Sequence, residues 1–113
     1  MKEERKRITN QQVEQILKRW NVVSAQAEYA LDQRAKERAK QLTTNIGHIV
    51  ECLPTEEREC IKSLYFHRLS WVCTTARMCI STHTLSRNRR RAIEDITQAL
   101  NGTLLPGENC NRD

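Results

Sequence analysis

The densest group of chemically capable side chains lies between residues 82 and 91. Four of the five residues from 87 to 91 are arginines, interrupted only by Asn88. An arginine guanidinium forks onto a guanine edge or clamps a phosphate, and serine and asparagine bond to either. On a single helix, this pattern predicts a face that contacts double-stranded DNA. The alternative interpretation is a solvated basic face that happens to be dense.

Position along the helix suggests a role for each residue. When a helix enters the major groove, its first residues reach base edges and its later ones meet the backbone. The residues expected to contact bases are Thr82, His83, Ser86 and Arg87. Thr84 lies with them in the first turn of the helix and is a further candidate. Those expected to contact phosphates are Arg89, Arg90 and Arg91, with Arg77 as a further candidate on the preceding helix.

Cysteine and histidine offer a second kind of chemistry. The five cysteines stand at positions 52, 60, 73, 79 and 110. No two of them have the close spacing typical of structural zinc sites, so we expect no metal and no cofactor. Nothing in the sequence places a base or an oxyanion hole beside a thiol, and we expect no enzymatic activity. An odd cysteine count without a secretory signal predicts reduced thiols in the cytoplasm.

The charge balance fits a polyanionic partner. The formal net charge is +5, with +3 over residues 1–53, +3 over residues 54–100 and −1 over the last thirteen residues. Such a balance favours phosphate contacts but is weak evidence alone, since many proteins that never bind nucleic acid carry it. No apolar run approaches the ~20 residues that span a bilayer, so no membrane association is expected.

The elements that carry these residues are predicted to be helices. The chain has only three glycines and two prolines, and its apolar residues do not alternate with period two, which indicates an all-α fold. Residues 9–43 should form a helix that begins with a capping box of Thr9 and Gln12. We expect either one long helix or two, broken near residues 43–47. The apolar stripe of the first part comprises Val13, Ile16, Leu17, Trp20, Val23, Ala27 and Leu31. After a solvated stretch, an apolar face resumes with Leu42, Ile46, Ile49, Val50 and Leu53.

Stop and start signals are clearer in the second half. A helix should begin at Pro54 and end near residues 67–68. Ser70 should cap a short helix to Met78, residues 79–81 should form a tight connection, and Ser81 or Thr82 should cap a last helix to about Leu100. Gly102 should end it, and the tail to residue 113 is expected to be disordered. The residues expected to lock the last two helices together are Leu69, Val72, Thr75, Met78, Ile80 and Leu85. Beyond them, the inward stripe of the last helix should continue with Ala92, Ile93, Ile96 and Leu100.

A family resemblance covers residues 53–100 without insertion. It rests on Leu53-Pro54 before acidic residues, Leu64-Tyr65, Leu69-Ser70-Trp71, Ile80-Ser81, Thr84-Leu85 and Arg91-Ala92-Ile93. In these residues the chain resembles region 4 of bacterial sigma factors, and more closely the sigma-region-4-like domain of phage transcriptional activators of the ArpU and RinA type. The chain departs from that pattern at residues 73–75, where the family usually has Glu-Ile-Ala, and at Cys79, where a glycine or small residue is usual.

The resemblance implies a helix-turn-helix over residues 54–101 and a regulator of phage or prophage late genes. Residues 1–53 would then pack on this unit, form a homodimer or bind a partner such as RNA polymerase. Two alternatives stay open. One is a DNA-packaging or recombination accessory protein with the same DNA contact. The other is a protein that binds polymerase or a sigma factor and does not read DNA itself.

Overall fold

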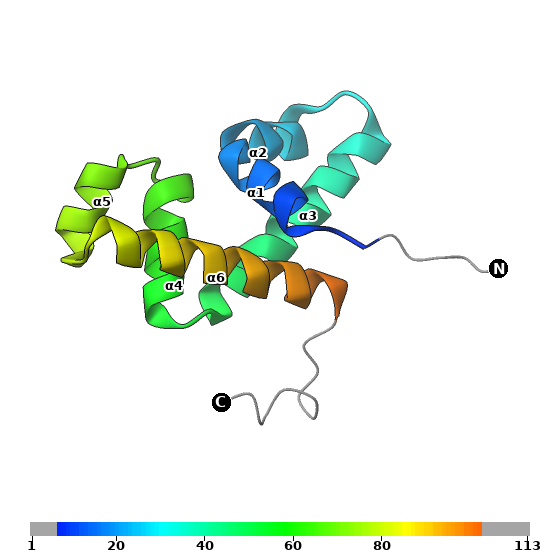
Figure 1. Ribbon diagram of the computed structural model, residues 1–113. Coiled ribbons are helices and arrows are strands. Elements are labelled where there is room, and N and C mark those ends of the chain that lie inside the picture. The colour runs from blue at the N-terminus through cyan, green and yellow to red at the C-terminus, as the bar shows by residue number, and fades with distance from the viewer. Residues whose placement is uncertain (1–6, 103–113) are drawn as a thin grey trace.

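The computed structural model describes residues 7–102, and every element in that range is a helix (Figure 1). The fold is all-α, as predicted. The elements are α1 (Asn10–Lys18), α2 (Trp20–Tyr29), α3 (Gln33–Cys52), α4 (Thr55–Ile61), the π-helix η1 (Lys62–Phe66), α5 (Trp71–Met78) and α6 (Thr82–Asn101). The expected disordered tail lies outside the described residues, apart from Gly102.

The N-terminal segment is three helices, where one or two were predicted. The capping box is present: the Thr9 side chain accepts from the Gln12 amide, and the Gln12 side chain accepts from the Thr9 amide. The chain then leaves the helical conformation at Arg19, whose φ and ψ are −110° and 28°, and again at Ala30, which is extended. Asp32 restarts it, because its carboxylate accepts from the Arg34 amide and so caps α3.

The predicted break at residues 43–47 is wrong. Helix α3 runs through this stretch for 20 residues, and Gly47 sits inside it. The reason is packing: Ile46 and Val50 are fully buried on the face that also carries Ala39. Burial of this stripe outweighs the ~1 kcal/mol by which glycine weakens a helix interior.

The predicted order of the second half and the caps at Ser70, Ser81 and Gly102 are confirmed, whereas Pro54 precedes α4 and does not form its first helical residue. Helix α4 continues directly into η1, and the Ser70 and Ser81 side chains accept from amides in the first turns of α5 and α6. Gly102 ends α6 in the left-handed conformation, with φ 72°. These termini follow local hydrogen bonding, which is why sequence patterns located them.

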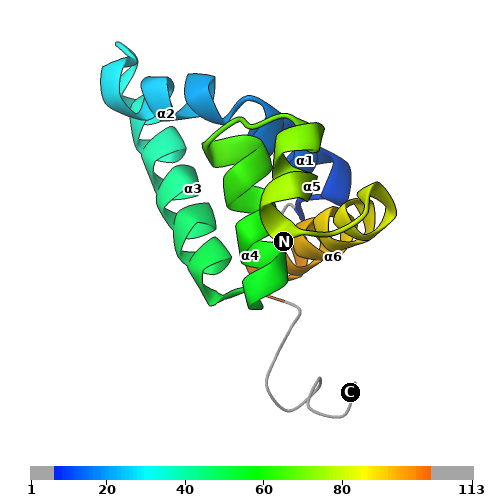
Figure 2. The ribbon, with the colours of Figure 1, turned by 90° about the vertical axis from the view of Figure 1, so that its left-hand side faces the viewer.

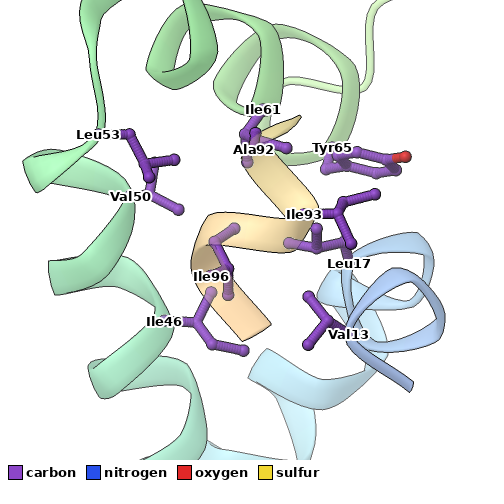
Figure 3. Close-up of a cluster of buried hydrophobic side chains, with 10 residues drawn as sticks. All are labelled: Val13, Leu17, Ile46, Val50, Leu53, Ile61, Tyr65, Ala92, Ile93 and Ile96. Atoms are coloured by element: carbon purple, nitrogen blue, oxygen red, sulfur yellow. The ribbon is translucent and has the colours of Figure 1, made fainter. Parts of the chain in front are cut away.

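One core joins both halves of the chain (Figure 3). Helices α1 and α3 contribute Val13, Leu17, Ile46 and Val50, and the later elements contribute Ile61, Tyr65, Ala92, Ile93 and Ile96. Trp20 also links the halves, since its ring stacks on Phe66 with centroids 4.6 Å apart. The α1–α3 region is therefore packed on the later helices through a shared core. Leu53, where the two parts of the chain meet, is itself a buried member of that core.

Two residues expected inside the protein lie on its surface. Leu31 is fully exposed in the connection between α2 and α3, because the helix that would have turned it inward ends at Tyr29. Val72 is 77% exposed on α5, and the buried residue of that helix is Thr74, whose hydroxyl donates to the Ser70 carbonyl at 2.9 Å. Trp71 is also 39% exposed. Within residues 7–102, no helix combines the length and apolar character that crossing a membrane requires.

Candidate nucleic-acid interface

Helix α6 crosses the molecule, and its N-terminal half lies beside α5 at the end away from α2 (Figures 1 and 2). A three-residue connection, 79–81, separates the two helices. Cys79 takes the left-handed conformation, with φ 57° and ψ 46°, and the Ile80 amide donates to the Thr75 carbonyl at 3.1 Å. This turn fixes the direction in which α6 leaves α5.

The outer face of α6 is polar and basic. Five of its residues are exposed, namely Thr82, His83, Arg87, Arg90 and Arg91. Ser86 is half-buried. Leu85, Asn88 and Ala92 are buried on the opposite side. Helical spacing therefore places most of the residues predicted to meet DNA on one solvent-facing surface, which we call the α6 basic face (Thr82, His83, Ser86, Arg87, Arg90 and Arg91).

Thr84 occupies a different position from its predicted neighbours. It is half-buried, its amide donates to Ser81 Oγ at 3.1 Å, and the Ser81 hydroxyl donates to Thr84 Oγ1 at 3.1 Å. These bonds close the first turn of α6. Thr84 thus shapes the start of the helix and lies at the edge of the α6 basic face.

Arg89 points inward and is separated from the other arginines. Its Nη1 donates to Glu14 Oε2 at 3.2 Å and to the Tyr65 hydroxyl at 3.4 Å, and its Nε is buried with no hydrogen-bond partner among the described residues. Burial opposes its charge, but the bonds to Tyr65 and Glu14 raise the pKa of Arg89 overall. This geometry disagrees with the expected phosphate contact. The four-residue spacing from Leu85 to Arg89 to Ile93 was the sequence signal for an inward position.

Arg77 lies outside the α6 basic face, and Arg91 is the last residue of that face. Arg77 is exposed in the last turn of α5. Arg91 lines a small polar hollow together with Glu57, Glu94, Asp95 and Gln98. The charge of Arg91 is therefore partly balanced by nearby carboxylates.

Sequence patterns did not predict that the carboxyl group of Glu57, which lies near Arg91, is buried. Glu57 is 8% exposed, and its Oε1 has no hydrogen-bond partner among the described residues. Burial, and then the neighbouring Asp95 carboxyl, raise the pKa of Glu57 to about 8, against a smaller opposing effect of Arg91. Glu57 is therefore largely protonated at neutral pH. Glu57 is one of three acidic residues near the start of α4. Its sequence position indicates only a charged group that interacts favourably with the positive end of the helix dipole.

The thiols and histidines of the described part of the chain do not gather into a site. Cys52, Cys73 and Cys79 are exposed and unpaired with one another, and Cys60 is buried. Burial raises the pKa of the Cys60 thiol to about 12, so that it stays protonated and packs as a small apolar group. Within residues 7–102, no three histidine, cysteine or acidic side chains are placed to hold a metal ion.

Comparisons of the chain with protein-family models, curated proteins and solved structures find no match.

Proposed function

We propose that this protein is a sequence-specific DNA-binding transcription regulator that inserts α6 into the major groove. The observation that carries the proposal is the division of α6 into two faces: Arg87 and Arg90 point to solvent, while Leu85 and Ala92 anchor the same turns in the protein. A helix held in this way presents cations and hydrogen-bond donors on a rigid support.

The α5–turn–α6 arrangement supports a helix-turn-helix mode of binding. Its first helix is short, its connection has three residues, and its second helix is exposed along the polar side. The resemblance of residues 53–100 to sigma-region-4-like phage activators supports the same mode, and on that basis we assign the protein to regulation of phage or prophage genes.

Within this proposal the residues divide by their distance from the helix start. Thr82, His83, Ser86 and Arg87 read bases, with Arg87 able to fork onto a guanine. Arg90, Arg91 and Arg77 contact phosphates. Arg89 is left out of the interface, because its guanidinium is held by Glu14 and Tyr65.

The test is a selection from randomised DNA duplexes followed by affinity measurement. Full-length protein is first used to enrich a binding sequence, and fluorescence anisotropy then compares this duplex with a scrambled one at several salt concentrations. We expect tight binding to the selected duplex and a loss of about a hundredfold or more in the Arg87→Ala, Arg90→Ala double variant, from one base and one phosphate contact.

A matched control separates this face from general basicity. The Lys36→Ala, Lys40→Ala double variant removes the same charge from α3 and should bind within about twofold of wild type, since these residues lie outside the proposed interface. Equal binding by wild type and the Arg87→Ala, Arg90→Ala variant would show that α6 is not the reading element. Failure of the selection to enrich any sequence would refute sequence-specific reading.

A further inference from the structure

A second surface lies at the far end of the molecule from the α6 basic face. Helices α2 and α3 pack side by side as a hairpin, which projects away from α5 (Figures 1 and 2). Three of the five large apolar side chains that are exposed among the described residues belong to this hairpin: Val22 at 51%, Tyr29 at 76% and Leu31 at 101%. These three residues lie within ten positions of one another in sequence. Exposed apolar residues that lie together mark interaction sites more often than singly scattered ones do.

An open groove of about 420 Å³ runs between the two helices. Its apolar lining comes from Val23 of α2 and from Ala35, Ala39 and Leu42 of α3. The two alanines keep the floor of the groove low, because neither side chain reaches beyond Cβ. A groove of this kind, formed by an antiparallel helix pair, accepts the apolar side of a third helix.

The charge at the groove determines which kind of helix it fits. Gln26, Arg38, Gln41 and Asn45 complete its lining, so that its described lining residues include a cation and no acid. Arg34 lies one turn before Arg38 on the same face of α3 and is exposed. The acids nearest in sequence to the lining are Glu28, Asp32 and Glu37, and none of them belongs to it. Asp32 caps α3, and Glu37 accepts from the Gln33 side chain at 3.2 Å. A second copy of this chain would bring its own arginines against these, whereas a partner with carboxylates beside its apolar stripe would pair with them.

We propose that the α2–α3 groove is a docking site for an acidic amphipathic helix of a protein partner. Aliphatic residues of that helix would enter between Val23 and Leu42, and its glutamates or aspartates would face Arg34 and Arg38. Tyr29 and Val22 would cover the helix along its other edge. This site is separate from the α6 basic face, and the inference stands whether or not α6 binds DNA.

The test uses a synthetic helix as the probe. A fluorescent peptide of about 18 residues, long enough for five turns, carries leucine at helical spacing and glutamate at the other positions, with a hydrocarbon staple to keep it helical. A second peptide has lysine in place of glutamate. Anisotropy with the full-length protein should show saturable binding of the acidic peptide only, and its addition should shift the NMR amide signals of Val23 and Leu42 but not that of Arg87.

Two charge-reversal variants localise the contact. Arg34→Glu, Arg38→Glu should weaken binding of the acidic peptide by about tenfold or more, while Lys36→Glu, Lys40→Glu, an equal change of charge on another side of α3, should alter it by less than about twofold. Circular dichroism is the control that checks whether both variants keep the helical fold.

Several results would overturn the proposal. These are binding of both peptides with similar affinity, equal weakening by the two double variants, or no binding of the acidic peptide at millimolar protein. Sedimentation could also reveal a dimer of the wild type that Leu31→Ser disperses. That result would assign the surface to a second copy of this chain instead.

Discussion

The guanidinium Nη1 of Arg89 lies 3.2 Å from the carboxylate Oε2 of Glu14, across 75 residues of sequence. This contact ties α1 to the middle of α6, and Lys18 adds a second cation to Glu14 at 3.6 Å. The N-terminal helix therefore supports the helix that carries the α6 basic face. The consequences can be measured residue by residue.

Arg89 and Arg90 are adjacent in sequence, but substitution of Arg89 should affect stability and substitution of Arg90 should affect DNA binding. Arg89→Ala should lower the free energy of unfolding by about 2 kcal/mol, because it removes charge-assisted hydrogen bonds that are partly shielded from water. Arg90→Ala should leave stability within about 0.5 kcal/mol and weaken DNA binding. Urea unfolding and anisotropy measure the two quantities. The assignment fails if Arg90→Ala is the destabilising variant.

A double-mutant cycle tests the pair itself. Glu14→Gln should be milder than Arg89→Ala, and the two together should be less destabilising than their sum by roughly 1 kcal/mol, since either change alone breaks the contact. Additive effects would mean that Arg89 acts through Tyr65 or through packing of its stem.

Glu57 should make stability depend on pH. In the folded protein its pKa is about 8, above the ordinary value of 4.5 expected in the unfolded chain. The stabilising effect of its proton is therefore complete below about pH 4.5 and is lost as pH rises to about 8. Glu57→Gln, which cannot ionise, should remove this decline and raise the free energy of unfolding at pH 8.5 by on the order of 1 kcal/mol.

The neighbouring Glu56 provides the control for that experiment. It is exposed and is the smallest of the contributors to the raised pKa of Glu57, so Glu56→Gln should keep most of the wild-type dependence on pH. Unfolding by urea at intervals from pH 4.5 to 8.5 measures all three proteins. An unchanged slope in Glu57→Gln would assign the titration to another group.

The left-handed residue in the α5–α6 connection should tolerate only some substitutions. Cys79 has φ 57°, a conformation that asparagine accepts and that β-branched residues resist. Cys79→Val should lower the melting temperature, at a cost of about 1–2 kcal/mol, and Cys79→Asn should be close to neutral. If valine and asparagine were equally tolerated, the turn would not hold this geometry in solution.

Asn101 joins the two ends of the described chain. Its Oδ1 accepts from the Ile8 amide and its Nδ2 donates to the Ile8 carbonyl, both at 2.9 Å. Asn101→Ala should destabilise the protein by about 1–2 kcal/mol and speed hydrogen exchange at the Ile8 amide. Asn21→Ala, at an exposed position in α2, is the control. Unchanged exchange at Ile8 in the Asn101 variant would mean that this contact does not persist.

Features that depend on neighbours a few residues apart could be predicted from the residues alone. Thr9, Ser70, Ser81 and Gly102 mark helix ends because each makes a hydrogen bond or adopts a backbone conformation within its own turn. The inward stripe of Leu85, Ala92 and Ile96 followed from helical spacing, and with it the solvent-facing position of Arg87 and Arg90.

Features that depend on distant partners follow from the packing of the helices. Helix α3 runs through Gly47 because Ile46 and Val50 are buried against other helices, and Leu31 is exposed because the chain turns at Ala30. Arg89 turned inward because Glu14 and Tyr65 meet it there. The spacing from Leu85 to Arg89 to Ile93 indicates an inward position for Arg89, but the acceptors of its guanidinium depend on which side chains the fold brings within hydrogen-bond distance.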